Sequence, residues 1–338
     1  MKLKQILSLA LLFAVQFLLS QTITFISEKT GQPLPQISVF GNDGSILAYS
    51  DIDGKIEKQK LDPFKENFQL VQDQFILGTF TYAQLNSDVV KVKDRIKDIE
   101  AVTIKKGKPA KYVLVKGNFN TYITVNGKLN TYADGVATYI FDYKSGKIKS
   151  LKIEHYRVFN NERAENNQKV VASNDFVSNL KLPDLQYAAR IDEYLAKRKN
   201  AKEVKNGKND AVELKTETLQ NREFSLFGYR FYDLQNIINY AYENDSKKAL
   251  RDLTSSSELF FMKIKHKSEP EYNQVNIYRN FYAAEIDYSD EINIDDVKFN
   301  KNQSNYSTEF WKTEDFPNMQ PIFSKFFKDD LKEKQNNK

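Results

Sequence analysis

Short runs of alternating apolar and polar residues, separated by turn sequences, follow one another between residues 22 and 104. Alternation with a period of two places every second side chain on one face, which is the pattern of a half-buried β-strand. It predicts seven strands, at residues 22–27, 37–40, 46–50, 68–77, 79–85, 89–92 and 99–104. Asn42-Asp43-Gly44 and Asp51-Ile52-Asp53-Gly54 supply turns, because glycine adopts a positive φ without steric cost. Seven short strands at this spacing indicate a β-sandwich.

Residues 105–182 form a second region, in which the alternating runs are longer. Three turn sequences lie close together in it: Asn126-Gly127, Asp134-Gly135 and Ser145-Gly146. They separate predicted strands at residues 111–125, 128–133, 136–143 and 147–159. Two-residue turns of this kind join adjacent antiparallel strands, so the region is expected to be an antiparallel meander. Tyr139, Phe141 and Tyr143 share one face of their strand and are expected to pack in the core or against neighbouring strands, and not to form a ligand platform.

Three later segments have apolar residues at helical spacing. They are residues 184–198, with Leu185, Ala188 and Ile191 in one stripe, and residues 231–242 and 320–331. A polar stretch at residues 199–209 predicts an exposed loop, and further strands are expected at 212–218, 259–267, 273–286 and 291–299. The sequence therefore predicts a mainly β protein. A seven-stranded N-terminal β-sandwich is followed by a β-rich α+β domain with an antiparallel meander and a few helices.

The first twenty residues have the pattern of a secretory signal peptide. Lys2 and Lys4 precede an apolar run at residues 6–19, and Ser20 follows it. A membrane helix needs roughly 18 or more apolar residues, and this run has 14. We therefore expect cleavage after Ser20, export, and no transmembrane span in the mature chain; an uncleaved anchor is the alternative.

Composition narrows the class of protein further. Removal of residues 1–20 leaves 48 basic and 45 acidic residues, a net charge of +3, without the clustering that nucleic-acid binding requires. The chain has no cysteine, so it has neither a lipid-anchor cysteine nor a disulfide framework. An exported chain without cysteine fits a bacterial envelope protein that is stabilised by its core alone.

Three sequence motifs lie in the N-terminal quarter. They are Thr30-Gly31-Gln32-Pro33-Leu34-Pro35-Gln36-Ile37-Ser38-Val39, Ser50-Asp51-Ile52-Asp53-Gly54-Lys55-Ile56 and Ile99-Glu100-Ala101-Val102-Thr103-Ile104. In this order they resemble carboxypeptidase-regulatory-like domains, although Asp73-Gln74-Phe75 stands where that family has a Gly-Tyr pair. The resemblance implies a non-catalytic, transthyretin-like β-sandwich of the kind that precedes many bacterial outer-membrane receptors and envelope proteins. It implies a domain at residues 21–104 and a second, β-rich domain at 105–338.

The chemistry-bearing motifs of common enzymes are missing. The chain has no Gly-x-Ser-x-Gly, Gly-x-Gly-x-x-Gly or Walker sequence, and its only histidines are His155 and His266. Both histidines lie among strand residues without a recognisable nucleophile nearby, although a Ser-His-Asp arrangement of distant residues stays open. An acidic cluster at residues 285–296 and the pair Asp51 and Asp53 superficially match calcium sites. Alternation with apolar residues favours solvated strand faces for the cluster, and Gly54 favours a hairpin turn for the pair. No catalytic, cofactor-binding or metal-binding residue is predicted, and no cofactor.

These observations favour a non-enzymatic, exported protein that is periplasmic, associated with the outer membrane or extracellular. The sandwich is expected to act as a spacer or docking module, and the second domain to bind an envelope protein or a glycan, not nucleic acid. One alternative is a secreted hydrolase with a glycosidase-like carboxylate pair in residues 105–338. Another is a carrier that holds an apolar ligand within the curved meander, under the 184–198 helix.

Overall fold

The computed structural model describes residues 22–61, 63–64, 67–73, 75–94, 110–161, 170–197, 201–205, 209–312 and 331–335, without the side chains of residues 216–221. The chain is mainly β and divides into two compact units. Unit 1 comprises Met1–Gln72 and Ile76–Arg95, and unit 2 comprises Asp73–Phe75 and Ile96–Lys338. The predicted signal peptide and the predicted boundary at residues 104–105 lie outside the described residues.

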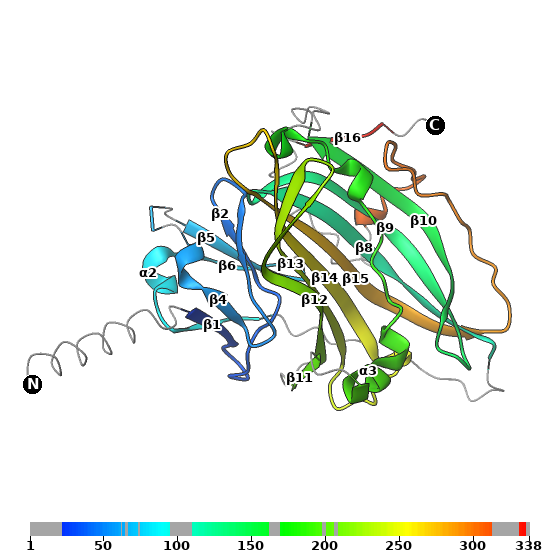
Figure 1. Cartoon of the computed structure of the whole chain (residues 1–338). Helices are drawn as coiled ribbons and strands as arrows, with labels where there is room; N and C mark the ends of the chain where they lie inside the picture. Colours follow the sequence, from blue (N-terminus) through cyan, green and yellow to red (C-terminus); the bar gives the residue numbers. More distant parts are fainter. Residues whose placement is uncertain are drawn as a thin grey trace, which may run out of the picture. The chain divides into compact units, whose positions relative to one another are not determined.

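Unit 1 has two sheets that share one apolar core (Figure 1). The first has the order β4 (Lys55–Glu57), β1 (Thr22–Ser27) and β7 (Val89–Val92). The second has the order β3 (Ile46–Tyr49), β2 (Ser38–Gly41), β5 (Asn67–Gln72) and β6 (Phe75–Thr81). β1 is parallel to β7 and antiparallel to β4. Alternate side chains of both sheets, including Phe25, Val39 and Phe68, are fully buried between them, as period-two patterning requires.

Two predicted strands of unit 1 need correction. The segment predicted as one strand at 68–77 is two, β5 and β6, because Asp73 turns the chain with a φ of 50°. The segment predicted at 79–85 ends its strand at Thr81 and continues as the short helix α2 (Tyr82–Leu85). Thr81 and Gln84 cap that helix reciprocally. The predicted strand at 99–104 lies outside the described residues, and β4, which the sequence reading missed, brings the strands described in unit 1 to seven.

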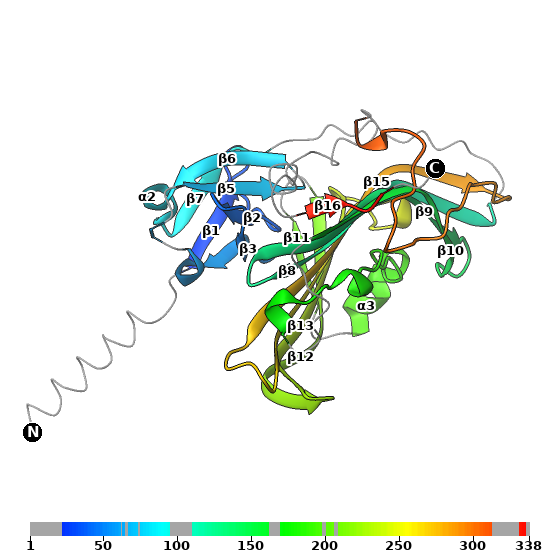
Figure 2. The ribbon, with the colours of Figure 1, turned by 90° about the horizontal axis from the view of Figure 1, so that it is seen from above.

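Unit 2 is built on one antiparallel sheet of nine strands (Figures 1 and 2). Their order is β11 (Ala201–Lys205), β12 (Asn209–Leu226), β13 (Tyr229–Glu243), β14 (Leu253–His266), β15 (Asn273–Ser289), β8 (Tyr112–Val125), β9 (Lys128–Asp142), β10 (Ile148–Asn161) and β16 (Leu331–Glu333). The predicted meander is thus β8–β9–β10, and β15 returns to pair with β8 in the middle of the sheet. Figures 1 and 2 show that this sheet is strongly bent.

The connection between β10 and β11 fills the inside of this bend. We call its described part, residues 170–197, the strap. It contains the 3₁₀ turns η2 (Val171–Ser173), η3 (Val177–Asn179) and η4 (Ala188–Arg190) and the helix α3 (Ile191–Lys197), which lies within the bend in Figure 2. Its side chains Val171, Phe176, Leu180, Leu185, Ala188 and Ile191 are buried in one cluster with residues of β8, β9, β10, β12 and β13. The strap therefore completes the core of unit 2.

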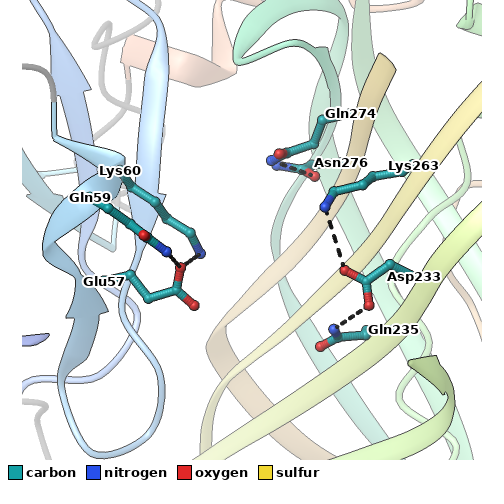
Figure 3. A network of polar contacts seen from close by, with 8 residues as sticks. All are labelled: Glu57, Gln59, Lys60, Asp233, Gln235, Lys263, Gln274 and Asn276. Atoms are coloured by element: carbon teal, nitrogen blue, oxygen red, sulfur yellow. Dashed lines mark hydrogen bonds and ion pairs between the residues drawn. The ribbon is translucent and has the colours of Figure 1, made fainter. Parts of the chain in front are cut away.

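The segment predicted as a helix at residues 231–242 is instead strand β13. Asp233, with a φ of 56°, forms a β-bulge, at which the pairing with β14 shifts by one residue. The shift moves the inward positions from odd to even residue numbers, so that the apolar spacing imitates a helix. In Figure 3 the Asp233 carboxylate accepts a hydrogen bond from Gln235 Nε2 at 3.2 Å and lies 3.9 Å from Lys263 Nζ.

The predicted turn at Asp134-Gly135 is also wrong, because β9 continues through both residues. Gly135 serves close packing: a Cβ there would lie 2.3 Å from the carbonyl oxygen of His155 and 2.7 Å from the ring of Phe119. A glycine in the middle of a long strand thus marks a close approach and not a hairpin.

Three further predictions concern the exposed segments of unit 2. The loop predicted at residues 199–209 contains β11, which pairs with β12. The segment predicted as a strand at 291–299 is not a β-strand in the structure. Its backbone contacts β10, where Val297 N–H donates to Ile153 O at 2.8 Å. The helix predicted at 320–331 lies outside the described residues except Leu331, which begins β16. Within the described chain, no helix is both long and apolar enough to span a membrane.

Candidate functional site

An open pocket of about 630 Å³ lies between the strap and the β9–β10 hairpin of unit 2. Its lining consists of Lys147, Ile148, Asp184, Gln186, Tyr187, Arg190, Glu193, Tyr194 and Lys197. The volume is within the range of pockets that hold small ligands, roughly 300–1,000 Å³. We call this site the strap pocket.

Helical periodicity separates the two faces of the strap. Leu185, Ala188 and Ile191 are buried in the core, whereas Tyr187 and Tyr194 line the pocket. Residues three and four apart share a face of a helical turn, so the segment anchors itself by one stripe and lines the pocket with the other. Tyr187 and Tyr194 of the second stripe are half-buried and also pack against the core cluster. The apolar stripe predicted from the sequence is confirmed, but the α-helix begins only at Ile191, after the 3₁₀ turn η4.

Three buried tyrosines fix the backbone of this segment. The hydroxyl of Tyr139 donates to Pro183 O, that of Tyr240 to Asp184 O at 3.1 Å, and that of Tyr242 to Ala188 O at 2.8 Å. Burial raises the pKa of all three hydroxyls, so they stay protonated and keep donating. The pocket wall is thus held on rigid strands.

The opposite wall is set by the turn of the β9–β10 hairpin. The Asp142 carboxylate accepts hydrogen bonds from Ser145 N and Ser145 Oγ, both at 2.7 Å, and these bonds lower the pKa of Asp142. Gly146, with a φ of 63°, brings the turn close to the strap, because a Cβ there would lie 3.2 Å from Ala189 Cβ. The turn places Lys147 and Ile148 in the lining.

Charge in the pocket is mixed, with three cations and two carboxylates. Arg190 Nε donates to Glu193 Oε1 at 3.1 Å, and Arg190 Nη2 to Glu193 Oε2 at 2.5 Å. Lys197 Nζ lies 3.8 Å from Glu193 Oε2. Hydrogen bonding to Arg190 lowers the pKa of Glu193, so this carboxyl is held ionised. The rings of Tyr187 and Tyr194 meet edge to face with centroids 4.4 Å apart.

This arrangement provides the contacts of a binding site. Tyrosine rings offer apolar faces, the cations attract anionic groups, and Asp184, Gln186 and Glu193 offer polar side chains. A general acid of the glycosidase type needs a raised pKa, and the pKa of Glu193 moves the other way. The described residues contain no group of three or more side chains placed to hold a metal ion.

The residues weighed in the sequence lie elsewhere. His155 stacks on Phe310 with ring centroids 5.8 Å apart, and His266 Nδ1 lies 2.6 Å from Ser268 Oγ. In the acidic cluster, Asp290 accepts a hydrogen bond from Lys111 N, and Asp296 binds Lys152 Nζ at 2.9 Å.

Asp51 of the N-terminal acidic pair accepts from the backbone N–H groups of Asp53 and Lys55, as in a tight turn. Asp51, Asp53 and the residues of the acidic cluster are thus outside the strap pocket. The sequence reading did not single out any pocket residue as functional. The sequence signal for them is the stripe of Tyr187, Arg190 and Tyr194, which lies opposite the apolar stripe that contains Leu185.

The comparisons with known proteins add no family. No protein-family model and no curated protein matches the chain. Among solved structures, one of lipovitellin, described as showing lipid–protein interactions in lipovitellin, is 8% identical with a TM-score of 0.25. That match covers 55% of this chain and 26% of the lipovitellin chain. This chain thus spans about a quarter of the length of the lipovitellin chain.

Proposed function

We propose that this is a non-enzymatic binding protein of the bacterial cell envelope, in which unit 2 binds an acidic glycan in the strap pocket. The observation that carries the proposal is the lining of the pocket, where two tyrosine rings lie beside Lys147, Arg190 and Lys197. Aromatic faces pack against sugar rings, and cationic groups pair with carboxylate or phosphate substituents. The wall is held by buried hydrogen bonds, which favours binding without rearrangement.

Unit 1 is, in this proposal, a spacer or docking module of the carboxypeptidase-regulatory-like kind. Support comes from the two ordered motifs at residues 30–39 and 50–56 and from the packing of two small sheets around one core. Export to the periplasm or the outer membrane is supported by Lys2, Lys4 and the short apolar run that follows.

The two alternatives are less well supported by the geometry. A glycosidase-like pair needs one carboxyl that stays protonated, whereas hydrogen bonding to Arg190 keeps Glu193 of the strap pocket ionised. A carrier needs room inside the bent sheet, whereas Leu185, Ala188 and Ile191 of the strap occupy that space.

Calorimetric titration of the full chain with oligogalacturonate, and with neutral malto-oligosaccharide as the matched control, tests the proposal. We expect binding of the acidic oligomer that weakens as salt rises, no binding of the neutral one, and no shortening of either oligomer on prolonged incubation. Cleavage of the oligogalacturonate would establish the hydrolase instead, and the absence of binding to it would contradict the glycan proposal.

A further inference from the structure

The tip of the β12–β13 hairpin carries an exposed apolar patch. Of the seven large apolar side chains exposed among the described residues, three lie within four positions there: Phe224, Leu226 and Phe227. Phe227 is 91% exposed at the apex. We call residues 222–231 the aromatic tip; the hairpin is yellow-green in Figure 1.

A phenylalanine does not suit the conformation that this turn requires at position 227. Phe227 and Gly228 have φ values of 48° and 85°, and they form a two-residue loop between the paired residues Leu226 and Tyr229. The β8–β9 hairpin uses the same geometry, with φ values of 51° and 79°, but builds it from Asn126-Gly127. Asparagine tolerates a positive φ, whereas a bulky aromatic residue there is strained.

The aromatic tip is amphipathic. Phe224 and Phe231 stack with centroids 4.8 Å apart, and Leu226 lies opposite Tyr229, so one face of the hairpin is apolar. Arg230, opposite Ser225, belongs to the other face.

Three exposed cations flank the apolar patch. Arg222, Arg230 and Lys267 are exposed, and the backbone N–H of Lys267 donates to Gly228 O at 2.9 Å, which places it beside the apex. Carboxylates lie there too: Glu223 is 3.9 Å from Arg230 Nη1, and Glu269 and Glu271 belong to the same β14–β15 turn as Lys267. An apolar apex flanked by these exposed cations complements the interface of an anionic lipid bilayer.

We infer that the aromatic tip docks this protein on an anionic membrane surface, with Phe227 and Leu226 entering the interface and Arg222, Arg230 and Lys267 contacting the headgroups. The hairpin pairs its backbone up to Leu226 and Tyr229, so its insertion leaves few polar backbone groups without partners. The strained Phe227 is then explained by the membrane and not by the fold.

Flotation of the full chain with vesicles of phosphatidylglycerol and phosphatidylcholine tests this inference. We expect binding that weakens with salt, and little binding to phosphatidylcholine alone. Phe227→Asn should lower the vesicle affinity about tenfold, because a phenyl ring is lost from the interface. It should also raise the melting temperature by about 2–4 °C, because the turn is relieved of strain. Phe64→Asn, at a side chain that is 93% exposed in unit 1, is the matched control and should leave the vesicle affinity unchanged.

A charge reversal at Arg230 provides a second, independent test of the inference. Arg230→Glu should weaken binding to the phosphatidylglycerol vesicles and leave residual binding to phosphatidylcholine as it is. Absence of vesicle binding by the parent chain, or Phe227→Asn binding as tightly as the parent, would overturn the inference. The inference would also be overturned if the aromatic tip bound another protein while the parent chain did not bind vesicles. Phe227→Asn is expected to bind oligogalacturonate as the parent chain does, which would show that membrane docking and glycan binding are independent functions of different sites.

Discussion

At the scale of single residues, the strap is held by a few buried hydroxyl groups. Tyr240 and Tyr242 are fully buried neighbours on the inward face of β13, and their hydroxyls reach two carbonyl oxygens of the strap. Leaving a buried carbonyl oxygen without a hydrogen-bond donor lowers the free energy of unfolding by about 1–3 kcal/mol, so each hydroxyl contributes measurably to stability. These tyrosines lie beneath the pocket and do not line it.

Tyr242→Phe is expected to lower the free energy of unfolding by about 1–2 kcal/mol, because Ala188 O loses its partner in the core. Urea denaturation of the full chain measures the change. Tyr143→Phe, at a side chain that is 45% exposed, is the control and should change the free energy by less than about 0.5 kcal/mol. Equal effects of the two variants would show that the hydroxyl of Tyr242 does not hold the strap.

At the scale of secondary-structure elements, the β9–β10 turn forms one wall of the strap pocket. The β9–β10 turn supplies Lys147 and Ile148 to the lining, and the Asp142 carboxylate holds it through two hydrogen bonds with Ser145. The folded state lowers the pKa of Asp142. The stabilisation is therefore present above the unfolded pKa, about 3.9, and is lost as the pH falls through the lower folded value.

Asp142→Asn is accordingly expected to lower the urea midpoint of unit 2 at pH 7, because the amide lacks the carboxylate charge that strengthens both bonds. The difference from the parent chain should shrink as the pH falls below about 3.9 and vanish once the pH is below the lower pKa of the folded carboxyl, where the parent side chain is neutral too. Urea midpoints of the two chains across this pH range are the measurement. A difference that is independent of pH would contradict the role given to the charge.

The sequence predicted elements well where one periodicity ran without interruption. Strands β1 and β7 match their predicted bounds, and β8 and β15 were found in most of their length. Errors arose where a β-bulge changed which residues face the core, as at Asp233 in β13. They also arose where a glycine allows close packing within a strand and does not form a turn, as at Gly135 in β9. The strap pocket was not predicted, because its residues belong to a hairpin and a connection that only the bend of the sheet brings together.

At the scale of the whole molecule, the described residues fall into two units with separate cores. Thirteen buried apolar residues form the core cluster of unit 1, and all belong to residues 23–92. The larger cluster of unit 2 lies wholly within residues 113–286. Because each cluster is complete within its own unit, neither unit should need the other to bury its apolar side chains.

Separate expression of residues 21–106 and 107–338 is therefore expected to give two soluble fragments, each with a cooperative unfolding transition in urea. The transitions should occur close to those of the full chain. If the full chain unfolds cooperatively while neither fragment does, the two β regions share one core and the division is wrong.

The central claim is that the strap pocket is the binding site of unit 2. Its most direct test is the affinity for oligogalacturonate, measured by calorimetry, of the parent chain, of Tyr194→Ala and of Arg190→Gln. Both substitutions lie at the pocket surface, and each should weaken binding about tenfold through the loss of a ring face or a charged hydrogen bond. Tyr143→Ala, which removes a ring outside the lining, should bind as the parent does. Parent affinity in both pocket variants would place the site elsewhere and contradict the account.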